Sequence, residues 1–227
     1  MKYLLHIIAI GFITVLSSCG EFFTFDDAEP VGNVSMRVAQ DTAYIMVGDT
    51  MALIVNFDPP KTDNLPVFWD MNRSVNDSSA IIYNDTITAM MVGEVDVMAY
   101  GVSGTVSDTC HVIVIDRWLD QSFETLHPSD MVIYGNITVG GQPWNDSTQI
   151  VAAFARGSII GFAHEQEAFG INYALLRIWN LADSLIGSVS FRCYDREKHM
   201  LYQAAQHPQF DGLNALGTLS DLYQITF

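Results

Sequence analysis

Hydrophobic and polar residues alternate with a period of two along most of this chain after residue 34. In Glu94–Tyr100, Thr109–Ile115 and Met131–Val139, every second residue is apolar or glycine. Successive side chains of a strand point to opposite faces, so this pattern is typical of strands with one buried face. Gly, Pro, Asn and Asp separate the stretches at intervals of about 8–15 residues, which predicts an all-β fold of antiparallel sandwiches.

Two details of the C-terminal half come from the same pattern. Arg156-Gly157 lies between the apolar segments Ile150–Ala155 and Ser158–Phe162, which predicts a hairpin. Tyr173–Trp179 fits a helix or a strand, and we interpret it as a strand whose partner is Leu185–Tyr194.

The N-terminus is typical of an export signal. Lys2 precedes an apolar run from Leu4 to Leu16, about 13 residues long, whereas a bilayer core needs roughly 20. Two small residues then lead into Cys19, and this order resembles the lipobox of bacterial lipoproteins. The resemblance implies that Cys19 carries the acyl chains of a membrane anchor. The alternative is an ordinary cleaved signal with an incidental cysteine.

Residues 34–115 resemble the bacterial Ig-like domains of group 2. The matching residues are Val47-Gly48-Asp49-Thr50, Val67-Phe68-Trp69, Thr86–Ala89 with Gly93–Ala99, and Cys110–Val114. The resemblance implies a sandwich with Trp69 in its core. The C-terminal half resembles a β module of Bacteroidota surface proteins. The matching residues are Gly135–Val139, Ile150–Phe154, Val189–Asp195 and Leu216–Leu219.

The fold class expected is therefore all-β, with two β-sandwich domains in tandem after a lipoprotein signal peptide. The expected segments are a signal peptide at 1–18, a tether at 19–33, an Ig-like sandwich at 34–116 and a C-terminal sandwich at 117–227. The lipobox and the resemblance to Bacteroidota surface proteins imply a lipid-anchored protein of the outer membrane, at the cell surface or on the periplasmic face.

Composition excludes one large class of partner. The chain has 10 basic and 26 acidic residues and a net charge of −16, which repels the phosphate backbone of nucleic acids. Cys110 and Cys193 fall in different predicted domains, so we expect two buried free thiols rather than a disulfide.

No catalytic, metal or cofactor site is expected. The nucleophile, zinc and phosphate-loop motifs of common enzymes do not occur in the sequence. Asp195 and Glu197 are the acid pair most easily drawn as catalytic, but they follow a strand end, where solvated acids are expected. Calcium between loops is a weaker alternative, because no loop has the regular order of a calcium-binding loop.

Trp144 is the candidate ligand-binding residue. It lies in the turn-rich loop at residues 140–147, where a large aromatic side chain can stack on a sugar or pack on its own domain. For Trp118, at the junction, packing between the domains is favoured. The expected function is non-catalytic adhesion or glycan binding; the alternatives are a structural subunit of an envelope complex and a polysaccharide-acting enzyme.

The lipobox gives the first testable prediction. Mass spectrometry of the mature protein should find Cys19 at the N-terminus, carrying acyl chains, because the signal is too short to remain as a membrane span. An unmodified N-terminus, or one at another residue, would contradict the prediction.

Overall fold

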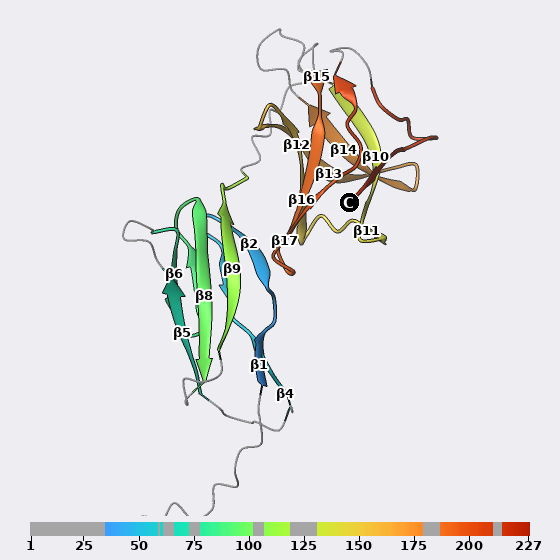
Figure 1. Ribbon diagram of the computed structural model, residues 1–227. Coiled ribbons are helices and arrows are strands. Elements are labelled where there is room, and N and C mark those ends of the chain that lie inside the picture. Colours follow the sequence, from blue (N-terminus) through green and yellow to red (C-terminus); the bar gives the residue numbers. More distant parts are fainter. Residues whose placement is uncertain are drawn as a thin grey trace, which may run out of the picture. The chain divides into compact units, whose positions relative to one another are not determined.

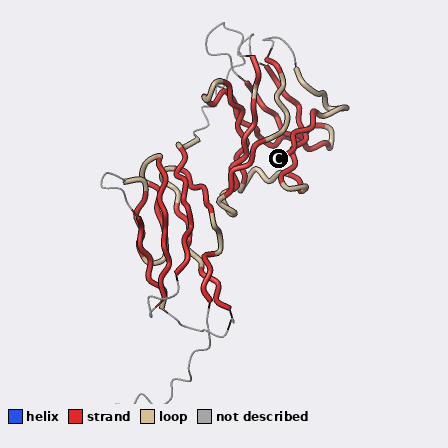
Figure 2. The backbone as a smooth tube through the Cα atoms, viewed as in Figure 1, coloured by secondary structure: helices blue, strands red, loops and turns tan. Residues whose placement is uncertain are grey.

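The computed structural model describes residues 35–58, 60, 66–72, 78–101, 107–118, 131–178, 187–210 and 215–227 (Figure 1). Cys19, the predicted signal peptide and the tether lie outside the described residues. Every regular element in the described ranges is a β-strand (Figure 2), and none of them holds a helix long and apolar enough to span a membrane. The chain divides into the compact units Met1–Ser35 and Met36–Phe227, and the second unit holds nearly all of the described residues.

The N-terminal β body, here called sandwich 1, extends from β1 to β9. Its largest sheet has the strand order β2-β9-β8-β5, with β2 parallel to β9, and a second sheet has the order β3-β7-β6; β1 pairs with β4. The bounds are β1 Ser35–Val38, β2 Thr42–Met46, β3 Thr50–Ala52, β4 Val55–Asp58, β5 Val67–Asn72, β6 Ala80–Tyr83, β7 Thr86–Ala89, β8 Gly93–Gly101 and β9 Ser107–Ile115.

One core holds sandwich 1 together. Val95 and Val97 of β8 and Val112 of β9 point inward at alternate positions, and they meet Met51 and Ile87 from the opposite sheet. The two sheets are therefore packed face to face, as the alternation in the sequence predicts. Trp69 lies half-buried against this core.

The C-terminal β body, here called sandwich 2, extends from β10 to β19. Its main sheet has the order β11-β10-β14-β13-β12-β16-β17, and β19 runs parallel to β10; β15 pairs with β18. The bounds are β10 Met131–Val139, β11 Gln142–Pro143, β12 Gln149–Ala155, β13 Ser158–Ala168, β14 Ile171–Ile178, β15 Gly187–Ser188, β16 Ser190–Asp195, β17 Met200–Gln203, β18 Gln209–Phe210 and β19 Tyr223–Thr226.

Strands from distant places in the main sheet share one core in sandwich 2. Ile133 of β10, Leu176 of β14, Val151 of β12 and Phe191 of β16 are all fully buried in the same cluster. Ile225 of β19 closes it. This sheet therefore curls over its own apolar face, and burial is reached largely within one sheet instead of between two equal ones.

The all-β, sandwich-type fold class is confirmed. The hairpin at Arg156-Gly157 is also confirmed: φ is 51° and 85° at these residues, which join β12 to β13. Positive φ at both positions gives the turn a twist that matches the flanking strands.

The strand interpretation of Tyr173–Trp179 is confirmed over the described residues, since β14 ends at Ile178. Its predicted pairing with Leu185–Tyr194 is wrong. A tight turn at Phe169-Gly170 joins β13 to β14, so one edge of β14 pairs with β13. The other edge of β14 pairs with β10. With both edges occupied, β16 pairs with β12 and β17.

Gly161 is a point where this sheet accepts no side chain. A β-carbon there would collide with the backbone carbonyl of Arg177 on the neighbouring strand. We therefore expect Gly161→Ala to lower the free energy of unfolding by about 2 kcal/mol or more, because overpacked sites cost about 1–3 kcal/mol.

Urea denaturation with Gly157→Ala as the control measures this effect. Nothing lies within 4 Å of a β-carbon at Gly157, so that variant carries only the strain of a φ of 85°, about 1 kcal/mol. Equal stabilities of the two variants would contradict the prediction.

Candidate functional site

Trp118 anchors the segment that follows β9. It is 9% exposed, and its ring contacts the rings of Phe154 and Tyr194 edge-on. The distances between ring centres are 5.3 Å to Phe154 and 6.4 Å to Tyr194. Such aromatic pairs contribute about 0.5–1.5 kcal/mol beyond the burial of area. Met46 of sandwich 1 belongs to the same cluster, so the predicted packing of Trp118 between the two β bodies is confirmed.

A cavity of about 290 Å³ opens beside Trp118, and we call it the Trp118 cavity. Its walls combine apolar and charged side chains from β12, β13 and the flanking loops. The lining residues are Arg117, Trp118, Asp146, Ile150, Phe162, Ala163, His164 and Arg196.

Two arginines, Arg117 and Arg196, are among the residues that line this cavity. Arg117 and Arg196 are exposed, and neither forms an ion pair with a carboxylate of the described residues. Their backbones are held in place: the Arg117 amide donates to Asp116 Oδ1 at 2.8 Å, and the Arg196 amide donates to the Thr148 carbonyl at 2.9 Å. The Trp118 cavity thus has guanidinium groups on fixed backbone that are available to a ligand.

Asp146 adds an acceptor to the same cavity. One of its carboxylate oxygens, Oδ2, accepts the Glu165 amide at 3.3 Å, and the side chain is otherwise exposed. Carboxylates and guanidinium groups together offer acceptors and donors to a ligand rich in hydroxyl groups. Arg117, Asp146 and Arg196 were missed from the sequence, since they are 29 to 79 positions apart and only the folded chain brings them together.

Trp144, the residue predicted to bind a ligand, lies half-buried against the core of sandwich 2. Its Nε1 donates to the Gln149 carbonyl at 2.9 Å. The prediction that it binds a ligand stays a prediction. Its loop nevertheless contributes to the Trp118 cavity through Asp146, two positions further along.

Asp195 is not the solvated turn acid that its position in the sequence suggests. It is 2% exposed, and its Oδ2 accepts the side-chain amide of Gln149 at 2.9 Å, while its Oδ1 accepts the backbone amides of Glu197 and Lys198. Burial alone raises the pKa of Asp195, but these hydrogen bonds and the Lys198 ammonium outweigh burial and lower the pKa overall. Asp195 therefore orders the turn between β16 and β17.

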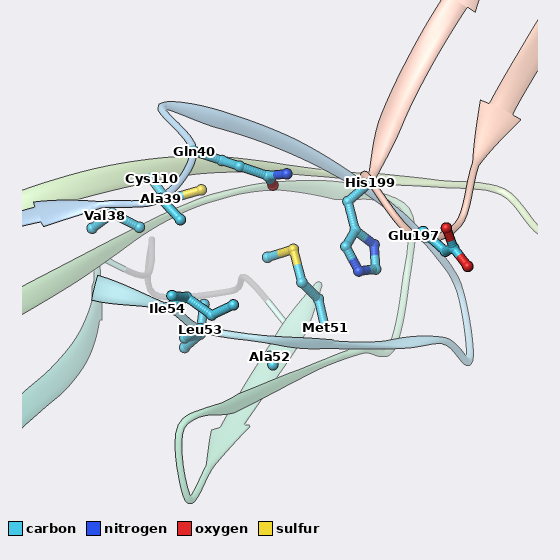
Figure 3. A pocket seen from close by; sticks show the side chains of 10 residues that line it. All are labelled: Val38, Ala39, Gln40, Met51, Ala52, Leu53, Ile54, Cys110, Glu197 and His199. Carbon is cyan, nitrogen blue, oxygen red and sulfur yellow. The ribbon is translucent and has the colours of Figure 1, made fainter. Parts of the chain in front are cut away.

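That turn also carries His199, which lines a smaller pocket of about 170 Å³. Figure 3 shows His199 and Glu197 at this pocket together with Gln40 and Met51 of sandwich 1. Burial lowers the pKa of His199, and nearby carboxylates only partly offset this. The His199 carbonyl accepts the Tyr44 amide at 2.7 Å, so the turn is a contact between the two β bodies.

A third cavity, of about 600 Å³, is also lined by Trp118. Arg192 lines this third cavity, and its guanidinium group lies 4.6 Å from the centre of the Phe154 ring in a cation–π contact. Because this arginine has a partner and the acids Glu94 and Asp116 lie along the same walls, the Trp118 cavity is the better candidate site.

The predicted free thiols are confirmed for Cys110 and Cys193, both of which are buried. Burial raises the pKa of Cys110 to about 11 and that of Cys193 to about 12. Thiols with such pKa values are protonated at neutral pH and are poor nucleophiles.

No protein-family model and no curated protein matches this chain. Among solved structures, the extracellular cadherin domains 1–4 of protocadherin gamma B7 match at 12% identity and a TM-score of 0.30, over 78% of this chain and 50% of that one. Domains 1–6 of the surface layer protein SbsC match at 12% identity and a TM-score of 0.32, over 77% of this chain and 26% of that one.

A third match is a Bacteroides ovatus protein, SGBP-B of a mixed-linkage glucan utilization locus, solved with a heptasaccharide. The identity is 16% and the TM-score 0.23, over 73% of this chain and 42% of that one. This chain thus spans half or less of each of these three structures. Matches at these TM-scores assign no function to this chain, and its own residues remain the basis for a proposal.

The Asp195 network predicts a pH dependence of stability. A carboxyl whose pKa is lowered by folding stabilises the protein above its unfolded pKa of about 3.9, and this stability is lost as the pH falls through the folded pKa. Asp195→Asn should therefore lower the free energy of unfolding at pH 7 by about 1–3 kcal/mol.

Chemical denaturation from pH 7 to about pH 2 measures the effect, and the stability difference between the variant and the wild type should shrink as the pH falls below about 4. Glu167→Gln, which removes one charge from an exposed position of β13, is the control and should behave as the wild type. A stability difference that stays constant with pH would contradict the assignment.

Proposed function

We propose that this chain is a lipid-anchored, non-catalytic protein of the cell envelope that binds glycans, in adhesion or in carbohydrate capture, through the Trp118 cavity. The observation that carries the proposal is the composition of that cavity, which is lined by the apolar residues Ile150 and Phe162 and by Asp146, Arg117 and Arg196, whose side chains form hydrogen bonds. Sugars present both kinds of surface, because their rings have apolar C–H faces and a rim of hydroxyl groups.

Chemistry also favours binding over catalysis at this cavity. Glycoside hydrolysis needs two carboxyl groups flanking the bond, about 5–9.5 Å apart. Asp146 is the one carboxylate among the described residues that line the Trp118 cavity, and Asp195 is committed to the turn before β17. The groups that line the cavity can orient a sugar, but they do not include the pair of carboxyl groups that glycoside hydrolysis uses.

The proposed location comes from the N-terminal sequence. Cys19 in its lipobox-like context supports an anchor in the outer membrane, facing the cell surface or the periplasm. The net charge of −16 favours a hydrated, soluble ectodomain and opposes docking on anionic lipid or nucleic acid.

A structural subunit of an envelope complex is the second candidate function, and one observation favours it. Phe169 is 95% exposed at the tip of the β13–β14 hairpin, with a φ of 55° that a bulky residue rarely adopts. An exposed aromatic residue on a projecting turn suits a protein partner with an apolar pocket. A protein that binds the wild type in purified form, and not Phe169→Asn, would favour this role.

Glycan binding is tested on an array of bacterial and plant polysaccharides, followed by calorimetry with the best ligand. Asp146→Ala should weaken binding about tenfold or more, because a hydrogen bond to a charged group contributes about 1.5–3 kcal/mol. Glu167→Ala, which removes a similar charge from an exposed part of β13 outside the cavity, should bind as the wild type.

Trp144→Ala separates the two candidate surfaces. Trp144 helps to hold the loop that carries Asp146, so if the cavity binds the glycan, Trp144→Ala loses stability and weakens binding no more than Asp146→Ala does. A larger loss of affinity in a folded Trp144→Ala protein would place the ligand on Trp144 itself. Turnover of any polysaccharide, or binding of none, would overturn the proposal.

A further inference from the structure

Positive charge in this chain is scarce, and its placement is uneven. Of 36 residues that carry charge, 26 are acidic and 10 are Lys or Arg. Two of those arginines line the Trp118 cavity, where one carboxylate, that of Asp146, stands among the described residues. Neither arginine is ion-paired within the described ranges, so this small cavity has a local preference for anions that opposes the overall charge of the chain.

We propose that the Trp118 cavity recognises an acidic sugar residue, a uronic acid, whose carboxylate pairs with Arg117 and Arg196. The inference rests on the proposed glycan-binding function and names the ligand class. Guanidinium groups bind carboxylates through two parallel N–H donors, so the two arginines suit a planar carboxylate better than a hydroxyl group.

The fixed backbones of the two arginines favour this role. Arg117 is bracketed by the hydrogen bond of its own amide to Asp116 and by buried Trp118 next to it in the chain. Its Nη1 atom lies close to Gly48, 3.7 Å from the point where a β-carbon on that glycine would stand. Arg196 follows buried Asp195 in the ordered turn. Both side chains therefore start from rigid points, which reduces the entropy lost on binding.

Size and polarity restrict the ligand further. The cavity volume of about 290 Å³ lies just below the range of roughly 300–1,000 Å³ for ligand pockets, so one sugar residue fits better than several. Asp146 accepts hydrogen bonds from ring hydroxyls, and Ile150 and Phe162 face the apolar side of the ring. A single uronic acid residue of a longer chain offers all of these groups.

The experiment compares each acidic oligosaccharide with its own methyl ester. Oligogalacturonides and oligoglucuronides are titrated by calorimetry into the full mature chain, and the esters keep the sugar and the linkage but lose the charge. We expect the free acid to bind about tenfold or more tightly than the ester, as for other hydrogen bonds between charged groups.

Variants then assign the preference to the two arginines. Arg196→Gln and Arg117→Gln should bring the ratio of acid affinity to ester affinity close to one, while Arg37→Gln, at an exposed position of β1, should keep the wild-type ratio. Thermal melting of each variant confirms that it is folded. Because Arg117 and Arg196 are exposed, we expect little change in stability.

The outcomes separate this inference from the proposed function. Equal affinity for acid and ester overturns the uronic acid inference and leaves glycan binding intact. Binding of inorganic sulfate that competes as strongly as the acidic sugar shows a site for free anions and overturns the inference. Binding of no carbohydrate removes both. If Arg196→Gln and Arg117→Gln both keep the wild-type ratio of acid affinity to ester affinity, the charge preference belongs to other residues, and the uronic acid inference is overturned.

Discussion

The docking of Trp118 on Phe154 and Tyr194 is the contact on which the candidate site depends. β9 ends three residues before Trp118, and its burial fixes where the chain leaves sandwich 1. The same residue lines the cavity, and Arg117, its neighbour in the chain, lines the cavity as well. If the ring were released, the cavity would lose a wall and one of its two guanidinium groups.

A second constraint comes from the buried carboxylate of Asp195. Its hydrogen bonds to Gln149 and to two backbone amides connect β12 with the turn before β17. The Gln149 carbonyl in turn accepts a hydrogen bond from the indole N–H of Trp144, so the loop at residues 140–147 is connected to the same network. Arg196 and Asp146 are carried by these two ordered segments. The polar network thus orders the segments that carry two of the charged residues of the Trp118 cavity.

Sandwich 1 and sandwich 2 reach burial by different routes. In sandwich 1, two sheets share a core through short alternating strands. In sandwich 2, one long sheet curls, and Gly161 lets β13 approach the backbone of β14 where a side chain would collide. Phe162 and Ala163, which follow Gly161 on β13, line the Trp118 cavity.

The sequence by itself determined the strands, because alternation with period two and the turn residues act locally: Met131–Val139 and the hairpin at Arg156-Gly157 were found where the structure has them. It did not determine which strands pair when no tight turn joins them, so the partner of β14 was predicted wrongly, and it did not show that Asp195 is buried. Both depend on contacts between residues far apart in the chain. The same reason explains the site. Arg117, Asp146 and Arg196 carry no local signal, and only the tertiary structure, by docking Trp118 and closing the sheet, brings them into one cavity.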